Sequence, residues 1–179
     1  ADLTVTHLGA GNPLDAAELV VVAVPSRATA EIADWLVPRL EDGVGLLSLT
    51  KGLDPTTGVR LSELWHARCR PTTPFAMLSG PNPAEEVVAG QPTATVVAGD
   101  PALCVAVQDL LNGPRFRVYV NDDLLGVELC AAAKNVVAVA AGISDGLGFG
   151  DNAKASLITR GLAEMTRLGI ACGARADTF

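Results

Sequence analysis

Histidine and cysteine are scarce in this sequence, which limits the metal and redox chemistry that it can support. Of the 179 residues only His7 and His66 are histidines, so we expect no histidine-based metal site. The four cysteines form no CxxC pair, and each lies in an apolar or helical context. They are Cys69, Cys104, Cys130 and Cys172. We interpret them as reduced thiols of a cytoplasmic protein, because disulfides persist mainly in oxidising compartments.

Basic residues are also fewer than acidic ones. There are 13 Lys and Arg against 20 Asp and Glu, which gives a net charge of −7 and a pI of about 4.7. A nucleic-acid partner requires a basic face, so this balance argues against one. The balance does not argue against a small-molecule ligand that carries a phosphate, because one local pair of lysines can bind it. We see no signal peptide and no apolar run long enough to span a membrane, and therefore expect no membrane span.

Short apolar runs alternate with helical patterns over the first two thirds of the chain. The Val-rich run from Glu18 to Pro25 predicts a strand buried on both faces, as in a parallel sheet. A helical pattern follows it, and Ser26 is the predicted cap. Four further strands are predicted at residues 43–52, 74–81, 92–99 and 115–121, with helical patterns between them. Such alternation is typical of a layered α/β sheet.

The pattern changes after Asn121. We predict no strand between residues 122 and 173, but one helix over residues 124–141, a glycine-rich turn, and a second helix over residues 152–172. Asp151 is the predicted N-cap of the second helix. A second, helical domain therefore begins near residue 122.

Three loops are predicted at the carboxyl ends of strands, where ligands bind in open α/β sheets. They cover Val24–Arg27, Thr50–Gly52 and Ser79–Glu86. The last one opens a helix, whose backbone amides suit an anion. Each loop also has a plain structural interpretation as a strand exit, a turn with a solvated lysine, or a turn of turn-forming residues. The GAG at residues 9–11 does not complete a dinucleotide fingerprint, because Leu14 stands at the third glycine position.

A lysine interrupts an otherwise apolar helix in the stretch ELCAAAKNVVAVAAG, residues 128–142. A helix that is apolar all round is normally buried, and an unpaired ammonium is costly to bury. Lys134 therefore either extends along apolar surface to water or is held at a site that uses a buried amine. Asn135 beside it is either a satisfied core amide or part of the same site. The residues alone leave both alternatives open.

An ordered set of segments points to a known family. VVVAVPS, SLTKGLD and LSGPNPAEEV are followed by a long block from FRVYVN to TRLG and by a closing TF. In this the chain resembles the NAD(P)-dependent glycerol-3-phosphate dehydrogenases of bacteria, from Leu19 to Phe179. The most specific block is residues 126–169. The resemblance implies an α/β fold, with a partial NAD(P)-binding Rossmann-like sheet domain over residues 1–121. The start of an all-helical substrate-binding domain would follow over residues 122–179.

The resemblance also implies a function. The family interconverts sn-glycerol 3-phosphate and dihydroxyacetone phosphate with NAD or NADP, which would supply glycerophospholipid precursors in the cytoplasm. By resemblance, Lys134 is the catalytic proton-transfer lysine, and Lys51 contacts both substrate and cofactor. The other implied substrate-binding residues are Gly80, Asn82 and Asn135, and the other implied cofactor contacts are Pro25 and Ala84. The family often has Ser or Thr at the position of Asn82, so that assignment departs from the pattern.

By the same resemblance, the chain begins after the family's first strand and glycine-rich phosphate turn, and ends before residues that bind glycerol and its phosphate. The strand at residues 20–24 is then expected at the edge of the sheet, where an apolar edge favours association. The choice between NAD and NADP would depend on the preceding segment. A homodimer is an open alternative. Two other functions also stay open, a dehydrogenase of another small hydroxy compound and a non-catalytic module that binds a partner chain or a metabolite.

Overall fold

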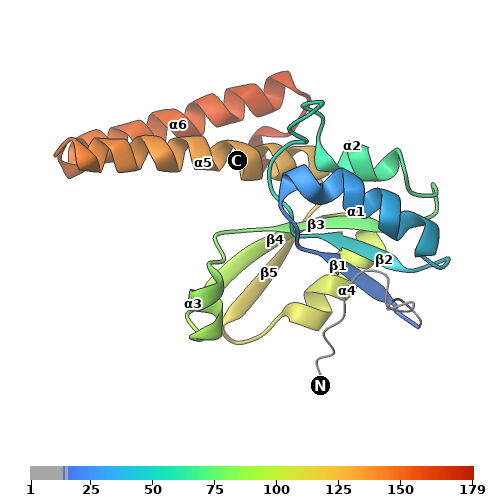
Figure 1. Cartoon of the computed structure of the whole chain (residues 1–179). Coiled ribbons are helices and arrows are strands. Elements are labelled where there is room, and N and C mark those ends of the chain that lie inside the picture. Colours follow the sequence, from blue (N-terminus) through green and yellow to red (C-terminus); the bar gives the residue numbers. More distant parts are fainter. Residues whose placement is uncertain (1–13, 15) are drawn as a thin grey trace.

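The computed structural model describes residue 14 and residues 16–179, and the strands in this part of the chain form one sheet (Figure 1). The strands lie across the sheet in their order along the chain, as β1 (Leu19–Val22), β2 (Gly45–Ser48), β3 (Phe75–Ser79), β4 (Thr93–Gly99) and β5 (Phe116–Asn121). Together with the helices between the strands, this sheet confirms the predicted α/β class.

The sheet is mixed rather than parallel throughout. β1, β2 and β3 are parallel, β4 is antiparallel to β3, and β5 is parallel to β4. A parallel crossover usually contains a dozen or more residues and a full helix. The connection from β3 to β4 contains only the five-residue helix α3 (Ala84–Val88), and the chain turns back beside β3.

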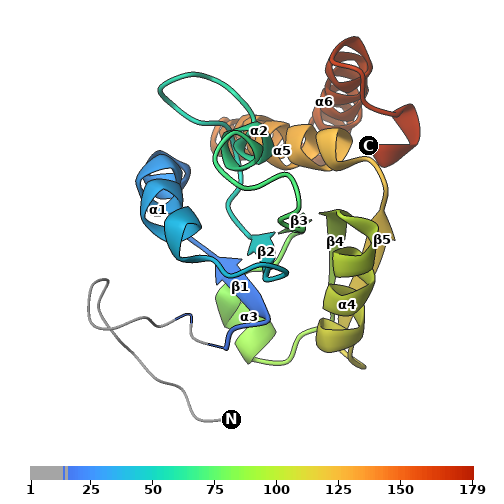
Figure 2. The same cartoon turned by 90° about the vertical axis from the view of Figure 1, so that its right-hand side faces the viewer.

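Helices cover both faces of the sheet. α1 (Thr29–Leu36) and α2 (Leu61–His66) lie on one side, and α4 (Pro101–Leu111) lies on the other (Figure 2). Neighbouring residues of β2 point to opposite sides, so Leu46 packs with the α1 and α2 residues and Leu47 with the α4 residues. Short 3₁₀ turns complete the connections at Ser26–Ala28 (η1), Val37–Arg39 (η2) and Ala176–Thr178 (η3). The central strands are thus buried between two layers of helices.

β1 lies at the edge of the sheet. Among the described residues it pairs with β2 alone, which confirms the expected edge position. Of its four residues only Val22 is buried, and Val21 is 51% exposed. The prediction of a strand buried on both faces is therefore wrong, because the face that carries Val21 is left partly uncovered. Association through this edge stays a prediction.

Two long helices follow the sheet and extend beyond it as a pair (Figure 1). They are α5 (Leu124–Gly146) and α6 (Asp151–Ala171). α5 is longer than predicted, so the turn between the helices covers only residues 147–150. Gly150 is the N-cap of α6 and Asp151 is its first residue, so the predicted Asp151 cap is wrong. The Asp151 carboxylate still carries negative charge at the positive end of the helix dipole.

Both predicted cap residues are displaced by one position. At the first helical segment Pro25 occupies the cap position and Ser26 begins the 3₁₀ turn, with no side-chain bond from the cap. Pro25 has a φ of −59° and a ψ of 146°, so its backbone is still extended and the helical conformation begins only at Ser26. The prediction of a Ser26 cap is therefore wrong as well.

α5 is apolar and mostly uncovered in this chain. It is long and apolar enough to cross a membrane, so the expectation that no such run exists is wrong as to length. Core helices of soluble proteins pass the same test, so this is weak evidence for a membrane span. Only 22% of its most apolar window is buried, and Val136, Val139 and Ile143 are all more than half exposed. Its buried residues lie near the start of the helix, at Gly126 to Glu128 and Ala131, except for Ser144 near the end.

Candidate functional site

The loops that follow β1, β2 and β3 lie together at the carboxyl ends of these strands, because the strands are parallel. Thr50 Oγ1 donates a hydrogen bond to the carbonyl oxygen of Val24 at 2.8 Å. Lys51 Nζ donates to the carbonyl oxygen of Gly80 at 2.6 Å. The middle loop is therefore tied to the loop on either side of it.

Gly80 stands where the third loop passes closest to β4. A Cβ at this position would lie 2.7 Å from the carbonyl oxygen of Ala94 and 2.9 Å from the Cα of Thr95. Asn82 Nδ2 donates to the same Ala94 oxygen at 3.2 Å and ties the loop to the strand. Glycine thus lets the loop lie against β4 while its own carbonyl accepts the Lys51 bond.

Replacement of Gly80 with alanine is expected to lower the free energy of unfolding by about 1–3 kcal/mol, the usual cost of overpacking. The added Cβ meets backbone atoms of β4, which cannot move away as a flexible side chain would. Urea denaturation measures the change. Gly113→Ala is the matched control, because no atom lies within 4 Å of the Cβ added there. Equal midpoints for the two variants would contradict the prediction.

α5 lies over β3 and β4 and closes a small cavity between the helix and the third loop. The cavity has a volume of about 210 Å³. It is lined by Ser79, Gly80, Pro81, Val96, Asn121, Val127, Cys130, Ala131, Lys134 and Thr178. The helical residues of this wall are spaced three and four apart and so lie on one face of α5. Pockets for drug-sized ligands hold about 300–1,000 Å³, so this space suits a smaller molecule.

Two positive charges lie near this cavity. Burial, and then the charge of Lys134, lower the pKa of Lys51 from its ordinary value. Cys130 shares the cavity wall with Lys134. Burial raises the pKa of the Cys130 thiol, and the Lys134 charge partly opposes that rise. Lys134 is therefore close to both groups, and two ammonium groups beside one small cavity favour an anion between them.

The third lysine of the chain lies elsewhere. Lys154 on α6 forms a surface ion pair with Asp145 at 2.6 Å. The sequence thus has three lysines, and two of them, Lys51 and Lys134, lie close together at the carboxyl ends of the parallel strands. Lys134 is half-buried and lines the cavity, so it is neither enclosed in a core nor fully exposed to water.

The structure brings some of the predicted site residues together and leaves others outside the cavity wall. Lys51, Gly80 and Lys134 meet, as described above. The Asn82 amide is bonded to β4, and Asn135 on α5 is exposed. Two others are also exposed, namely Pro25 at the end of β1 and Ala84 at the start of α3.

The start of α3 was predicted to offer backbone amides to an anion. The helix has only five residues, and its first turn carries the acidic side chains of Glu85 and Glu86. These carboxylates already interact with the positive, N-terminal end of the helix dipole. An added anion would meet these two carboxylates.

Analysis of the sequence missed three residues of the cavity wall, Asn121, Cys130 and Thr178. Thr178 comes from the far end of the chain, and only the TF pair in the family resemblance gave a signal for it. Asn121 Oδ1 accepts a hydrogen bond from the backbone amide of Asp123 at 2.8 Å. The turn from β5 into α5 is thereby fixed beside the cavity.

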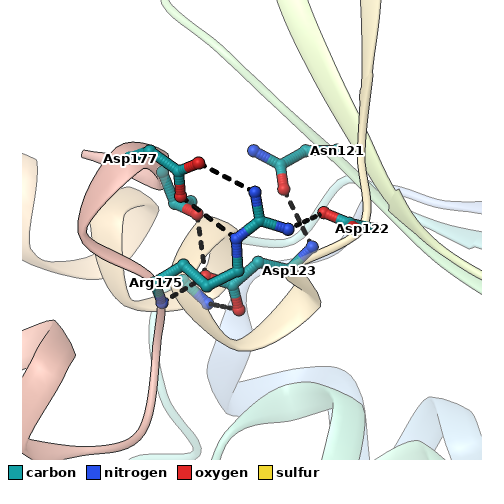
Figure 3. A network of polar contacts seen from close by, with 7 residues as sticks. Asn121, Asp122, Asp123, Arg175 and Asp177 are labelled. Atoms are coloured by element: carbon teal, nitrogen blue, oxygen red, sulfur yellow. Dashed lines mark hydrogen bonds and ion pairs between the residues drawn. The ribbon is translucent and has the colours of Figure 1, made fainter.

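Asp123 holds Thr178 in this position. Its carboxylate caps α5 by accepting a hydrogen bond from Gly126 N at 2.9 Å. It also accepts from Arg175 N and from Thr178 Oγ1, each at 2.8 Å. The Arg175 guanidinium lies between Asp122 and Asp177 and pairs with both, as Figure 3 shows. One carboxylate thus joins the start of α5 to the segment after α6.

An α/β sheet followed by a helical segment, with a small cavity where the two meet, is typical of α/β enzymes that bind ligands beyond the carboxyl ends of their strands. Comparison with protein-family models agrees with this class. Residues 5–104 match the model for the N-terminus of NAD-dependent glycerol-3-phosphate dehydrogenase, and residues 123–179 match the model for its C-terminus. The chain belongs to the NAD-dependent glycerol-3-phosphate dehydrogenase family.

Curated relatives and solved structures agree with this assignment. Glycerol-3-phosphate dehydrogenase [NAD(P)+] of Legionella pneumophila (strain Corby) is 49% identical over 93% of this chain and 50% of its own length. The enzyme of the same name from Clostridium perfringens (strain SM101 / Type A) is 43% identical over 99% of this chain and 55% of its own length. The crystal structure of glycerol-3-phosphate dehydrogenase from Coxiella burnetii is 40% identical, with a TM-score of 0.86. That match covers 92% of this chain and 50% of the other. The chain thus spans about half the length of the curated relatives it matches.

Proposed function

We propose that this chain carries the lysine-lined part of a glycerol-3-phosphate dehydrogenase site, which interconverts sn-glycerol 3-phosphate and dihydroxyacetone phosphate with NAD or NADP. The observation that carries the proposal is the meeting of Lys51, Gly80 and Lys134 at one small cavity. The charges suit a phosphate-bearing substrate, and the volume suits a three-carbon one. The names of the relatives support the same reaction.

Lys134 is the proposed proton-transfer residue. Its amine takes the proton of the substrate's C2 hydroxyl while the hydride leaves C2, and it returns that proton to the oxygen in the reverse direction. Lys51 is anchored by its bond to Gly80 O, so it can hold positive charge beside the substrate without moving. Burial, and then the charge of Lys134, lower the pKa of Lys51.

The nicotinamide cofactor supplies the hydride chemistry when it is bound. Dinucleotides bind beyond the carboxyl ends of strands in such sheets. The loops after β1, β2 and β3 form that edge here, and the added Cβ of Gly52 would meet no atom within 4 Å, so there is open space beside Lys51. The described loops therefore fit one side of the cofactor. Pro25, Lys51 and Ala84 are the residues proposed to hold it.

Asn82 and Asn135 are proposed as substrate contacts with less structural support. Asn82 would contact substrate through its backbone, because its amide side chain is engaged with β4. Asn135 is exposed next to Lys134 and would require a substrate that extends along α5. We also propose a cytoplasmic enzyme that supplies glycerophospholipid precursors. Pairing of two copies would cover part of the exposed apolar surface of α5.

The test is oxidation of NADH or NADPH by the purified chain, with dihydroxyacetone phosphate compared with unphosphorylated dihydroxyacetone. We expect turnover only with the phosphorylated substrate, because the lysine pair supplies its binding energy. Equal turnover with both would favour a dehydrogenase of another small hydroxy compound. Ligand binding without turnover, from folded protein, would contradict catalysis by this chain alone and favour the non-catalytic alternative.

A further inference from the structure

A buried carboxylate connects the sheet domain to the helix that carries Lys134. Glu128 on α5 is 3% exposed, although a buried charge is costly unless it is fully paired. Ser62 N donates to its Oε1 at 2.8 Å, and Ser62 Oγ donates to its Oε2. Arg60 Nη1 donates to the same Oε2, also at 2.8 Å. The carboxylate therefore accepts three hydrogen bonds, and one of them comes from a cation.

All three donors belong to the first turn of α2 or to its cap position. Arg60 is the N-cap of α2, and its side chain makes no cap bond to its own helix. Glu128 instead accepts the amide of Ser62, which lies in the first turn. Arg60 is itself held by Glu63 and by Ser62 Oγ. Glu128 thus acts as a cap that comes from another part of the chain, and it fixes one side of α5 against α2 (Figure 1).

We propose that Glu128 is a positioning residue, which fixes the rotation of α5 through Ser62 and Arg60 and thereby holds Lys134 against Lys51. Its part in catalysis rests on the function proposed above, whereas the geometric claim does not.

The helical geometry explains why this contact controls Lys134. Glu128 and Lys134 are six residues apart, which is about 9 Å along the axis at 1.5 Å per residue. With side chains, a helix has a radius of about 5–6 Å, so a rotation of α5 by about 20° moves a side-chain tip by about 2 Å. Beyond Ala131 α5 packs against α6, and the two helices extend beyond the sheet as a pair, so contacts there join the helices to each other rather than to the sheet. The Glu128 contact lies at the start of the helix and opposes such a rotation directly.

The test measures the separation of the two lysines through the titration of Lys51. Because the chain has three lysines, selective ¹³C-lysine labelling gives three Cε signals, which Lys→Arg variants assign. The charge of Lys134 lowers the pKa of Lys51, so Lys134→Met should raise that pKa and set the upper reference. In Glu128→Gln we expect the pKa of Lys51 to move most of the way to the same reference.

The direction of the change separates positioning from simple charge loss. Removal of a negative charge by itself would lower the pKa of a nearby lysine or leave it unchanged. Removal of Lys134 from its place raises the pKa of Lys51. Glutamine has the shape of glutamate, but one of its two terminal groups is an NH₂ donor. That group would face Ser62 or Arg60, which are themselves donors, so at least one of the present hydrogen bonds would be lost. Glu31→Gln, on the exposed surface of α1, is the control for loss of one negative charge and should leave Lys51 unchanged.

An unchanged or lowered pKa of Lys51 in folded Glu128→Gln would overturn the proposal. If circular dichroism shows that Glu128→Gln does not fold, Ser62→Ala takes its place in the test. That variant removes the hydroxyl donor to Glu128 and keeps the Ser62 amide and the Arg60 guanidinium. We expect a smaller rise of the Lys51 pKa in Ser62→Ala, and no rise would overturn the proposal equally. The result is independent of turnover. A Lys51 shift in a chain without dehydrogenase activity would support the positioning and contradict the proposed function.

Discussion

Lys134→Ala is expected to reduce the rate of cofactor oxidation with dihydroxyacetone phosphate by about 10²- to 10⁴-fold, the usual contribution of a positioned acid–base group. Lys134 lines the cavity, and its amine is the proposed proton-transfer group. Lys51 cannot replace it without giving up the bond from its Nζ to Gly80 O. Steady-state kinetics at saturating substrate measure the loss, which should fall mainly on kcat.

Two further variants define this effect. Lys154→Ala is the matched control, because that lysine forms only a surface pair with Asp145 and should retain full activity. Lys134→Arg keeps the positive charge, but arginine stays protonated at neutral pH and cannot accept a proton. We therefore expect Lys134→Arg to be nearly as slow as Lys134→Ala. A Lys134→Ala rate within a factor of ten of the wild type would show that another group transfers the proton.

The prominence of Lys134 could be predicted from the sequence because one physical conflict marks it. A charged side chain in an apolar helix must either reach water or be held by a partner. In the structure Lys134 is half-buried, between the core and the solvent. The strands were predictable for a similar reason, since runs such as residues 75–79 have no polar face and must be buried on both sides. Local patterns were enough wherever burial alone decided the outcome.

Features that depend on pairing between distant residues could not be predicted in this way. The antiparallel pairing of β4 with β3 brings Gly99, which has a φ of +143°, so close to β3 that an added Cβ would lie 2.3 Å from the carbonyl oxygen of Phe75. Nothing in the residue types around Gly99 indicates which strand lies beside it. The caps at Gly150 and Pro25 were missed by one position, because backbone angles and not side-chain preference set those helix starts.

The site shows the same division. Lys51 and Gly80 lie in loops that the strand pattern located, whereas analysis of the sequence assigned no role to Glu128 or Asp123. Their partners lie 66 and 52 positions away in the chain, and in each case one partner is a backbone amide. A backbone amide has no residue type, so no sequence pattern could have indicated these contacts.

Asp123→Ala is expected to lower the free energy of unfolding by about 1–3 kcal/mol, the range of a lost helix cap and a lost hydrogen bond to a charged group. The substitution removes the cap of α5 and the acceptor of both Arg175 N and Thr178 Oγ1. The segment after α6 should then separate from the start of α5. Urea denaturation measures the stability, and hydrogen exchange at the Arg175 amide measures the separation.

The pH dependence gives a second, independent test of Asp123. Burial raises the pKa of its carboxyl, but the amides of Arg175 and Gly126, the Thr178 hydroxyl and the Arg175 charge together lower it below its ordinary value. A carboxyl with a lowered folded-state pKa stabilises the protein above its unfolded pKa of about 3.9. That stabilisation is lost as the pH falls through the folded-state value. The difference between wild type and Asp123→Asn should therefore be constant near neutrality and shrink below about pH 4.

Asp122→Asn is the control that isolates this carboxylate from its neighbour. Asp122 is exposed, and in Figure 3 its carboxylate pairs with the Arg175 guanidinium, so we expect a change within about 0.5 kcal/mol, as for other surface pairs. Because Arg175 also pairs with Asp177, its guanidinium should stay in place in that variant. Equal losses in the two variants, or a difference between wild type and Asp123→Asn that grows as the pH falls, would show that net charge in this segment matters more than the cap. A large loss confined to Asp123 would instead mean that one carboxylate holds Thr178 in the cavity wall beside Lys134.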